Sequence, residues 1–270
     1  MGKFDMFENE VVWITGASSG IGEALALQFA AAGARLVLSA RRESELDRVR
    51  RLCAERGLAP DQLLVLPLDV TDHLAMPGAL AGVMQRFGRV DMLLNNAGIS
   101  QRSRCVDTEM EVYRRLLEVN VFGQIALTKQ VLPRMIEQRS GHIAVTASVA
   151  GKVGAPYRTG YCAAKHAVMG FFDALRAEVA AQGIRVTTIT PGFIRTDISV
   201  NALRGDGTEY GELDADIEGG MDVDRCAAAI MRGFLKGRPE IAVGNGMEMH
   251  ALWLKRLFPR LVFKLAARMA

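Results

Sequence analysis

Cysteine is scarce in this 270-residue chain, and its placement excludes two common structural roles. Cys53, Cys105, Cys162 and Cys226 are far apart and form no CxxC pair and no cluster with histidine. A disulfide framework or a zinc site is therefore not expected. A reducing compartment is the default for such a chain, and we predict a cytoplasmic protein without a bound metal.

Long apolar runs are missing as well. No stretch reaches the ~18 uninterrupted apolar residues that indicate a membrane span, and residues 1–10 lack the apolar core of a secretory signal. The formal net charge is only +3, without a long run of Lys and Arg, so nucleic acid is not an expected partner. Half of the residues are hydrophobic, which predicts a single globular domain over residues 1–270.

Short apolar runs alternate with longer segments of helical periodicity. Strands are predicted at residues 11–14, 36–38, 63–66, 92–94, 143–145, 186–189 and 241–243. Helices are predicted from Ile21 to Gly33, over 43–56, from a cap at Thr71 or Asp72 to Gly88, over 109–137 with a bend near Gly123 and Pro133, and over 157–182. This alternation predicts an α/β protein with a Rossmann-type, doubly wound parallel sheet of about seven strands and helices on both faces.

Two segments break this rhythm. Residues 193–224 have weak periodicity and many Gly, Asp and Glu residues, and we predict that they form a substrate loop. Residues 251–270 carry five basic residues and no acidic one, interleaved with large apolar residues. This basic amphipathic C-terminal tail either makes peripheral contact with a membrane or packs against the domain or a second subunit. The composition alone leaves both interpretations open.

A glycine-rich turn follows the first predicted strand. Glycine permits the sharp turn and lets a phosphate approach the backbone, and the following helix presents unpaired N–H groups. We predict that this turn binds the pyrophosphate of a dinucleotide, although an ordinary strand-to-helix turn would look similar. The predicted contacts are Gly16, Ser18, Ser19, Gly20, Ile21 and Gly22.

The residues after the second strand indicate which dinucleotide is bound. An acidic residue there would hold the ribose hydroxyls of NAD, whereas arginine suits the 2′-phosphate of NADP. The chain has Arg41 and Arg42 at this place and no acid, which favours NADP(H) over NAD(H). The alternative is that both arginines are solvated surface charges. Ser19 supplies no second positive partner.

Tyr161 and Lys165 are four residues apart on a predicted helix and therefore share one face. An ammonium close to the phenol would lower the phenol's pKa from about 10 and suit it to proton transfer. Such a pair is common by itself. Ser148 strengthens the case, because it follows the fifth strand at the edge where open parallel sheets bind ligands, and its hydroxyl can hold a substrate oxygen.

Five motifs occur in an order and spacing that resemble the short-chain dehydrogenase/reductase family. They are Gly16 to Gly22, Asn95 to Gly98, Asn120, the set of Ser148, Tyr161 and Lys165, and Pro191–Gly192. The resemblance covers about residues 8–245. It implies hydride transfer between NADP(H) and a carbonyl or secondary alcohol.

The resemblance also implies roles for single residues. Tyr161 would be the general acid/base, Lys165 would lower its pKa and hold the nicotinamide ribose, and Ser148 would orient the substrate oxygen. Asn120 would position a water beside Lys165. The remaining implied cofactor contacts are Asp69 and Val70 at the adenine, Asn96, Ala97 and Gly98 in the middle, and Pro191, Gly192 and Thr196 at the nicotinamide. Asn96 and the Pro191–Gly192 pair could instead be simple turn residues.

Within the family, residues 13–16, 36–42 and 100–103 show a looser likeness to membrane-associated reductases of lipophilic carbonyls. The likeness implies a lipophilic small-molecule substrate, although the N-terminal apolar anchor of that branch is absent from this sequence. Candidate apolar pocket residues are Met110, Phe193, Tyr210 and Met221. The family also implies a homodimer or homotetramer.

Two other functions compete with this interpretation. One is a catalytically silent, nucleotide-binding regulatory protein with the same fold. The other is a related epimerase or dehydratase, for which the short C-terminal region leaves little room for a larger substrate domain. The intact set of Asn120, Ser148, Tyr161 and Lys165 favours the oxidoreductase.

Overall fold

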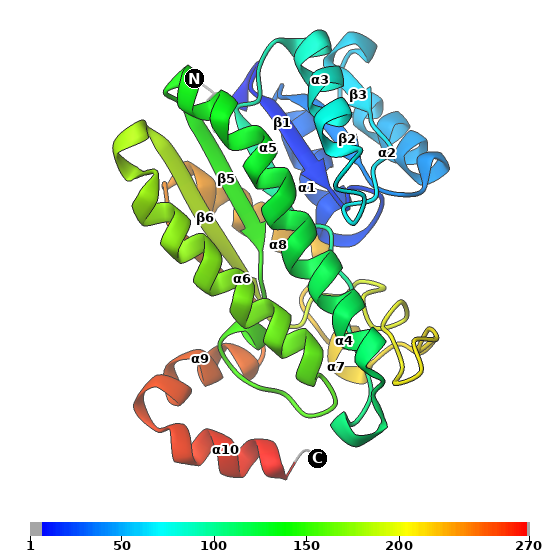
Figure 1. The fold of residues 1–270 in the computed structure, drawn as a ribbon, viewed down its shortest axis with the longest axis vertical. Coiled ribbons are helices and arrows are strands. Elements are labelled where there is room, and N and C mark those ends of the chain that lie inside the picture. The colour runs from blue at the N-terminus through cyan, green and yellow to red at the C-terminus, as the bar shows by residue number, and fades with distance from the viewer. Residues whose placement is uncertain (1–6, 269–270) are drawn as a thin grey trace.

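The computed structural model describes residues 7–268, so the first six residues of the predicted domain and the last two of the predicted tail lie outside it. Its centre is one sheet of seven parallel strands in the order β3-β2-β1-β4-β5-β6-β7 (Figure 1). The strands are β1 (Val11–Thr15), β2 (Arg35–Ser39), β3 (Leu63–Val65), β4 (Met92–Asn95), β5 (Gly141–Thr146), β6 (Ile184–Pro191) and β7 (Glu240–Val243). The predicted doubly wound fold is confirmed.

Both faces of the sheet are buried, because successive side chains of a strand point to opposite sides. In β1, Val12 and Ile14 belong to one apolar cluster, whereas Val11 and Trp13 belong to another. The helices that pack on the first face are α1 (Gly20–Ala31), α2 (Glu43–Glu55) and α8 (Val223–Leu235). Those on the second face are α3 (Met76–Phe87), α5 (Gly123–Gln138) and α6 (Thr159–Glu178).

The strand order reverses at β1. Ile14 is in register with Leu38 of β2 on one side and with Leu94 of β4 on the other. The chain therefore winds outward in two directions from this central strand. In such sheets a crevice opens at the carboxyl ends of the strands where the order reverses, and ligands bind there.

The long helix predicted over 109–137 is interrupted. It consists of α4 (Met110–Leu117), a π-helical turn η4 (Glu118–Phe122) and α5, and Pro133 lies inside α5 without ending it. The predicted bend is thus placed just before Gly123. A Cβ on Gly123 would come within 2.5 Å of the Val70 carbonyl oxygen, so the helix passes this strand-end loop too closely for any side chain.

Other predicted boundaries shift by a few residues. Helix α3 starts at Met76, not at a cap on Thr71 or Asp72, and Asp72 instead accepts a hydrogen bond from the Ala75 amide at 3.2 Å. It ends at Gly88, which has a φ of +75°. Helix α6 is followed by a separate 3-10 turn. The 3-10 turns are η2 (Pro60–Gln62), η3 (Cys105–Asp107), η5 (Val149–Gly151) and η6 (Ala180–Gln182).

The two irregular segments lie at the same end of the molecule (Figure 1). The predicted substrate loop runs from the end of β6 to α8 and contains the short helix α7 (Ala215–Glu218). The predicted tail forms α9 (Glu248–Leu257) and α10 (Pro259–Ala267). Within residues 7–268, no helix has both the length and the apolar character needed to cross a bilayer.

Candidate functional site

A cavity of about 1470 Å³ opens at the carboxyl edge of the sheet. It extends from Arg41 and Arg42, past the glycine-rich turn and Tyr161, to Leu254 of α9 and Val262 of α10. The predicted catalytic and cofactor-binding residues all line this cavity apart from Gly22. They therefore converge on one place, although the chain brings them from eight separate segments.

Gly22 is buried behind the turn and does not line the cavity. A Cβ at this position would come within 2.2 Å of the Gly16 carbonyl oxygen, so the residue lets α1 pack tightly beneath the turn. The structure thus gives Gly22 a packing role, and its predicted contact with the cofactor stays a prediction.

The glycine-rich turn has the backbone expected of a phosphate cradle. Gly16 and Gly20 have φ values of +63° and +57°, a region that disfavours residues with a Cβ. Ser19 precedes α1 without capping it through its side chain, which leaves the first amides of the helix available at the cavity wall. Arg48 of α2 braces the turn by donating to the Ser18 carbonyl oxygen at 3.1 Å. Sequence patterns did not indicate this bracing arginine.

The end of the cavity near β2 and β3 carries both basic and acidic side chains. Arg41 and Arg42 follow β2 and are both exposed to solvent at the cavity wall. Asp69 also lines the cavity, and it accepts hydrogen bonds from the Thr71 amide at 2.9 Å and the Thr71 hydroxyl at 2.8 Å. These bonds fix the orientation of the Asp69 carboxylate beside Val70.

Three strand ends are joined beneath the middle of the cavity. The hydroxyl of Thr15 accepts hydrogen bonds from the amides of Asn96 at 3.0 Å and Ala97 at 3.1 Å. The Asn96 side chain donates to the Thr15 carbonyl at 3.2 Å and accepts from the Thr146 hydroxyl at 3.0 Å. Asn96 thus links β1, β4 and β5, which gives it a structural role whether or not it also touches a cofactor. Thr15 and Thr146 were not among the predicted site residues.

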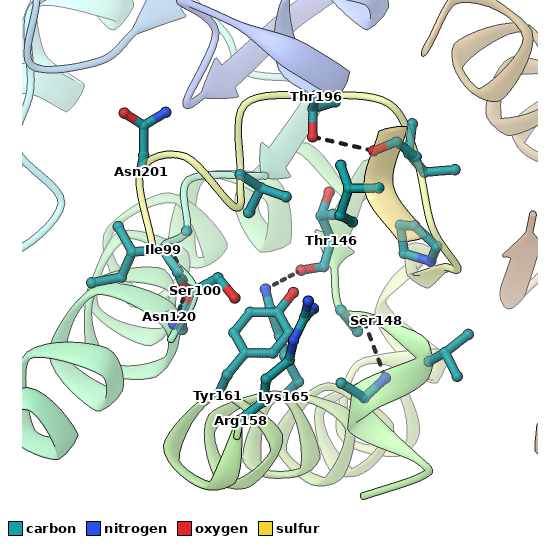
Figure 2. A pocket seen from close by; sticks show the side chains of 18 of the residues that line it. Ile99, Ser100, Asn120, Thr146, Ser148, Arg158, Tyr161, Lys165, Thr196 and Asn201 are labelled. Carbon is teal, nitrogen blue, oxygen red and sulfur yellow. Dashed lines mark hydrogen bonds between the residues drawn. The ribbon is translucent and has the colours of Figure 1, made fainter. Parts of the chain in front are cut away.

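Helix α6 carries Tyr161 and Lys165 on the same buried face (Figure 2). The Lys165 ammonium donates to the carbonyl oxygen of Thr146 at 2.7 Å and lies 5.7 Å from the centre of the Tyr161 ring. Burial disfavours the charged form and lowers the pKa of Lys165 to about 8. This lysine can therefore change its protonation state close to neutral pH.

The pKa of Tyr161 lies above its ordinary value, although opposing influences act on it. Burial raises it, because the phenolate would lose its hydration, while a hydrogen bond with Ser148 and the positive charge of Arg158 lower it. The Ser148 hydroxyl also accepts from the Ala150 amide at 3.1 Å (Figure 2). Ser148 is thereby held in place beside the phenol, at the cavity wall.

Asn120 is held by the loop that follows β4. Its side chain accepts from the Ile99 amide at 3.0 Å and donates to the Ile99 carbonyl at 2.9 Å, so both amide atoms are engaged (Figure 2). The residue lies in the π-helical turn η4 and is fully buried. A wide turn of this kind often marks a functional position in a helix.

Arg158 is a cavity residue that the sequence did not single out. Its guanidinium donates to Oδ2 of Asp214 at 2.6 Å, and Arg102 approaches the same carboxylate oxygen at 3.3 Å. Arg158 precedes Tyr161 by three residues, a spacing that could have suggested nearness. Its partner is 56 residues away in the chain, and no local pattern indicates that pairing.

The predicted apolar pocket residues are mostly elsewhere. Phe193 lines the cavity, but Met110, Tyr210 and Met221 do not, and the Met110 side chain is 62% exposed on α4. Apolar residues of α9 and α10 line it instead. Among residues 7–268 there is no cluster of three or more His, Cys, Asp or Glu side chains able to hold a metal ion.

Known proteins share this sequence and fold. A family model described as short chain dehydrogenase matches residues 10–206. Dehydrogenase/reductase SDR family member 7B of Bos taurus is 44% identical over 267 residues, which cover 97% of this chain and 82% of that protein. Dehydrogenase/reductase SDR family member 7 of Homo sapiens is 44% identical over 251 residues, which cover 92% and 74%.

The fold also has a solved counterpart. A short-chain dehydrogenase/reductase from Burkholderia phymatum in complex with NAD superposes with a TM-score of 0.83, covers 94% of this chain and 95% of its own, and is 24% identical. At 24% sequence identity, this solved structure supports only the shared fold. Taken with the family model and the two relatives, these findings establish that the chain belongs to the short-chain dehydrogenase/reductase family and is an NAD(P)-dependent oxidoreductase with a small-molecule substrate.

Proposed function

We propose that this protein transfers a hydride between NADP(H) and a lipophilic carbonyl or secondary alcohol, with Tyr161 as general acid/base. The observation that carries the proposal is the buried Tyr161 phenol, which is hydrogen-bonded to Ser148 and lies on the same helix face as Lys165. These groups line the same cavity as the glycine-rich turn. A phosphate cradle and a proton donor are thus within reach of one bound molecule.

Each residue near the phenol would have a separate role in the reaction. Bound NADPH would supply the hydride. Ser148 and Tyr161 would hold the substrate oxygen, and Tyr161 would transfer its proton to that oxygen as negative charge develops there. The positive charges of Lys165 and Arg158 would stabilise the phenolate that remains. In alcohol oxidation the same phenolate would accept the proton.

We propose that Asn120 helps to return the proton from solvent, by holding a water near Lys165. Gly98 supports this role. A Cβ at Gly98 would come within 2.7 Å of the Asn120 side-chain oxygen and 3.6 Å of the Lys165 ammonium, so the glycine keeps the space beside both groups open.

The residues of the cavity fit a dinucleotide with a 2′-phosphate. Gly16 and Gly20, both at positive φ, would shape a cradle for the pyrophosphate, and Asp69 at the cavity wall would hold the adenine. Arg41 and Arg42 offer two guanidinium groups after β2 without an acidic residue at the strand end. We therefore propose NADP(H) in preference to NAD(H). Pro191, Gly192 and Thr196 would contact the nicotinamide end.

The far end of the cavity supports a lipophilic substrate. Its wall includes Phe193, Ile198, Leu254, Val262 and Leu265, whose side chains are apolar. The substrate loop and helices α9 and α10 contribute these residues, so the parts of the chain outside the repeating α/β pattern shape the substrate end. We propose that residues 1–270 form one domain that combines both sites.

We also propose that α9 and α10 make peripheral contact with a membrane. Large apolar side chains are exposed on these helices: Trp253 is 71% exposed, Leu257 67% and Phe263 61%. Lys255, Arg256, Arg260, Lys264 and Arg268 are interleaved with them, and no acidic residue follows Glu248. An apolar surface with a basic rim suits the interface of an anionic bilayer. This surface of α9 and α10 lies beside the substrate end of the cavity, where a lipophilic compound could enter.

A homodimer is proposed through the outer surface of α6. That surface exposes small residues at helical spacing, which permit close approach of a second helix. They are Ala163, Ala167, Gly170, Ala174 and Ala177. Sedimentation velocity of an Ala174→Arg variant should show a smaller particle than the parent.

We propose a cytoplasmic setting for the protein. All four cysteines are free thiols, which fits a reducing compartment.

The experiment that tests the proposed reaction replaces the phenol. Tyr161→Phe should bind NADPH as the parent does in a fluorescence titration, but lose roughly 100- to 10,000-fold in turnover with a lipophilic ketone. Tyr210→Phe is the matched control, because it removes a phenolic hydroxyl from a residue outside the cavity. Equal turnover by Tyr161→Phe and the parent would show that Tyr161 is not the acid/base. Full NADPH binding by the parent, with no turnover across a broad carbonyl panel, would favour the silent regulatory alternative.

A further inference from the structure

Gln101 is a fully buried polar residue that does not line the cavity. Its side chain is 1% exposed, and it lies in the loop after β4, between the cavity residues Ser100 and Arg102. Burial of an amide is costly unless its donors and acceptor are all paired. Its hydrogen-bond partners therefore indicate what the residue does.

The side-chain oxygen of Gln101 caps the helix that carries Tyr161. The first amides of a helix have no partner within the helix, and Arg158, which precedes α6, does not cap it through its side chain. Gln101 Oε1 accepts hydrogen bonds from the amides of Gly160 at 2.7 Å and Tyr161 at 3.4 Å. A residue 60 positions from Tyr161 in the chain thus supplies the missing cap at the catalytic turn.

The other end of the amide is fixed as well. Gln101 Nε2 donates to the hydroxyl oxygens of Ser103 at 3.0 Å and Thr108 at 3.2 Å. The Thr108 hydroxyl itself donates to the Arg104 carbonyl at 2.6 Å, so it must accept from Gln101. Reversing the amide would place its nitrogen against the two helix amides, donor against donor. The oxygen is therefore held toward α6.

Gly160 is required for this approach. A Cβ there would come within 2.7 Å of side-chain carbons of both Leu116 and Tyr113, and within 3.0 Å of Gln101 Oε1. The first turn of α6 is therefore enclosed by α4 and by the Gln101 amide. Little space is left for Tyr161 to shift along the helix axis while these contacts persist.

The backbone around Gln101 is bound to the substrate loop. The Arg102 amide donates to the Leu203 carbonyl at 2.8 Å, and the Leu203 amide donates to the Ser100 carbonyl at 2.9 Å. These two bonds form a parallel bridge between Gln101 and Leu203. One residue is therefore bonded through its backbone to the substrate loop and through its side chain to the catalytic helix.

From these contacts we propose that Gln101 is a positioning residue, which couples the ordered substrate loop to the placement of the Tyr161 phenol. The inference rests on the proposed role of Tyr161 as acid/base. If the cap is removed, two buried amides lose their acceptor and the first turn of α6 loosens. The phenol then spends less time at the distance and angle that proton transfer requires, and small misplacements cost large factors in rate.

The test compares an isosteric variant with a conservative one. Gln101→Met keeps the length and removes the acceptor, and we expect kcat for ketone reduction to fall roughly 10- to 100-fold, with NADPH affinity within about twofold of the parent. Gln101→Glu keeps the acceptor toward the helix, where its charge is favourable, but loses the amide nitrogen that donates to Ser103 and Thr108, so we expect a smaller fall in kcat than in Gln101→Met, of about threefold to tenfold. Gln62→Met is the matched control, because the Gln62 side chain accepts from the Ala59 amide at 3.0 Å in the turn before β3, outside the cavity.

A double variant separates positioning from general damage. In a Tyr161→Phe background there is no phenol to place, so adding Gln101→Met should not lower the residual rate further. A further fall in that background would overturn the proposal, as would equal losses from Gln101→Met and Gln101→Glu, or an unchanged kcat in Gln101→Met.

A milder variant covers the case in which Gln101→Met does not fold. Thr108→Val removes one partner of the Gln101 amide nitrogen at a half-buried site, and we expect a smaller fall in kcat, of about threefold to tenfold, with unchanged NADPH affinity. No fall would overturn the proposal. If Tyr161→Phe itself retains full turnover, the proposed function fails rather than the positioning role.

Discussion

The guanidinium of Arg158 donates to the carboxylate of Asp214 at 2.6 Å, and this ion pair joins the turn before α6 to the substrate loop. Both side chains are largely buried, at 14% and 7% exposure, so the pair is weakly screened by solvent. The charge that lies close to the Tyr161 phenol is thus held in place from the loop that closes the substrate end. The Arg158–Asp214 ion pair therefore connects the order of the substrate loop to the charge beside the Tyr161 phenol.

Removing the Arg158 charge should shift the pH dependence of the reaction. In the proposed mechanism alcohol oxidation needs the Tyr161 phenolate, and the positive charge of Arg158 lowers the pKa of that phenol. We expect Arg158→Met to move the rising limb of kcat/KM for oxidation to higher pH, and Arg158→Lys to restore much of the parent profile. Initial rates between about pH 6 and pH 10 measure this. A shift to lower pH in Arg158→Met would contradict the assignment.

Lys165 should make the stability of the cofactor-free protein depend on pH. Burial lowers its pKa to about 8 in the folded protein, from the ordinary value of 10.5 for a solvated lysine. Between these values the unfolded chain binds one more proton than the folded protein, so the free energy of unfolding should rise with pH. The expected rise is roughly 3 kcal/mol across this window, with none from this group below about pH 8.

Urea unfolding of the parent and of Lys165→Met at about pH 7 and about pH 10.5 measures this contribution. Methionine has no titrating group, so the difference between the two proteins isolates the lysine from all other titrations. Relative to Lys165→Met, the parent should gain stability on going to the higher pH. If the parent loses stability relative to the variant, the lysine is not held in a desolvated site.

The arginines after β2 should decide which dinucleotide is preferred. In an Arg41→Ala, Arg42→Ala double variant the 2′-phosphate would lose its charged partners, and we expect KM for NADPH to rise roughly 10- to 100-fold while KM for NADH changes little. Arg51→Ala is the control, because it removes an exposed arginine of α2 that does not line the cavity. A parallel rise in both KM values would show that the arginines serve stability or the shared part of the cofactor.

The exposed face of α9 and α10 should bind anionic membranes. We expect the parent to co-sediment with vesicles that contain phosphatidylserine and to do so less at high salt, since part of the attraction is electrostatic. Trp253→Glu combined with Phe263→Glu should abolish the binding. Leu74→Glu, at a side chain that is 94% exposed elsewhere on the surface, should leave it unchanged. If the double variant still binds vesicles, the membrane contact lies elsewhere on the protein. If the parent does not bind vesicles, the exposed apolar face of α9 and α10 would instead contact another protein.

The short apolar runs were enough to predict the strands, because a buried parallel strand needs apolar side chains on both faces and glycine or polar residues at its ends. The Gly16 to Gly22 turn could be found for a similar reason, since its backbone requires glycine whatever surrounds it. The break between α4 and α5 was harder to place. Nothing local distinguishes a π-helical turn at 118–122 from a continuous helix, and the close approach of Gly123 to Val70 belongs to the assembled fold.

By itself the sequence determined the sheet, the cradle, the family resemblance and the pairing of Tyr161 with Lys165, because each depends on residues that are close in the chain or on a motif of fixed spacing. Only the tertiary structure decided what surrounds the phenol. Gln101, Arg158 and Asp214 come from three loops and meet at the start of α6, where Gln101 bonds to a residue 59 positions away and Arg158 to one 56 positions away. Such contacts depend on how the loops cross the edge of the sheet, and no periodicity or local spacing encodes that.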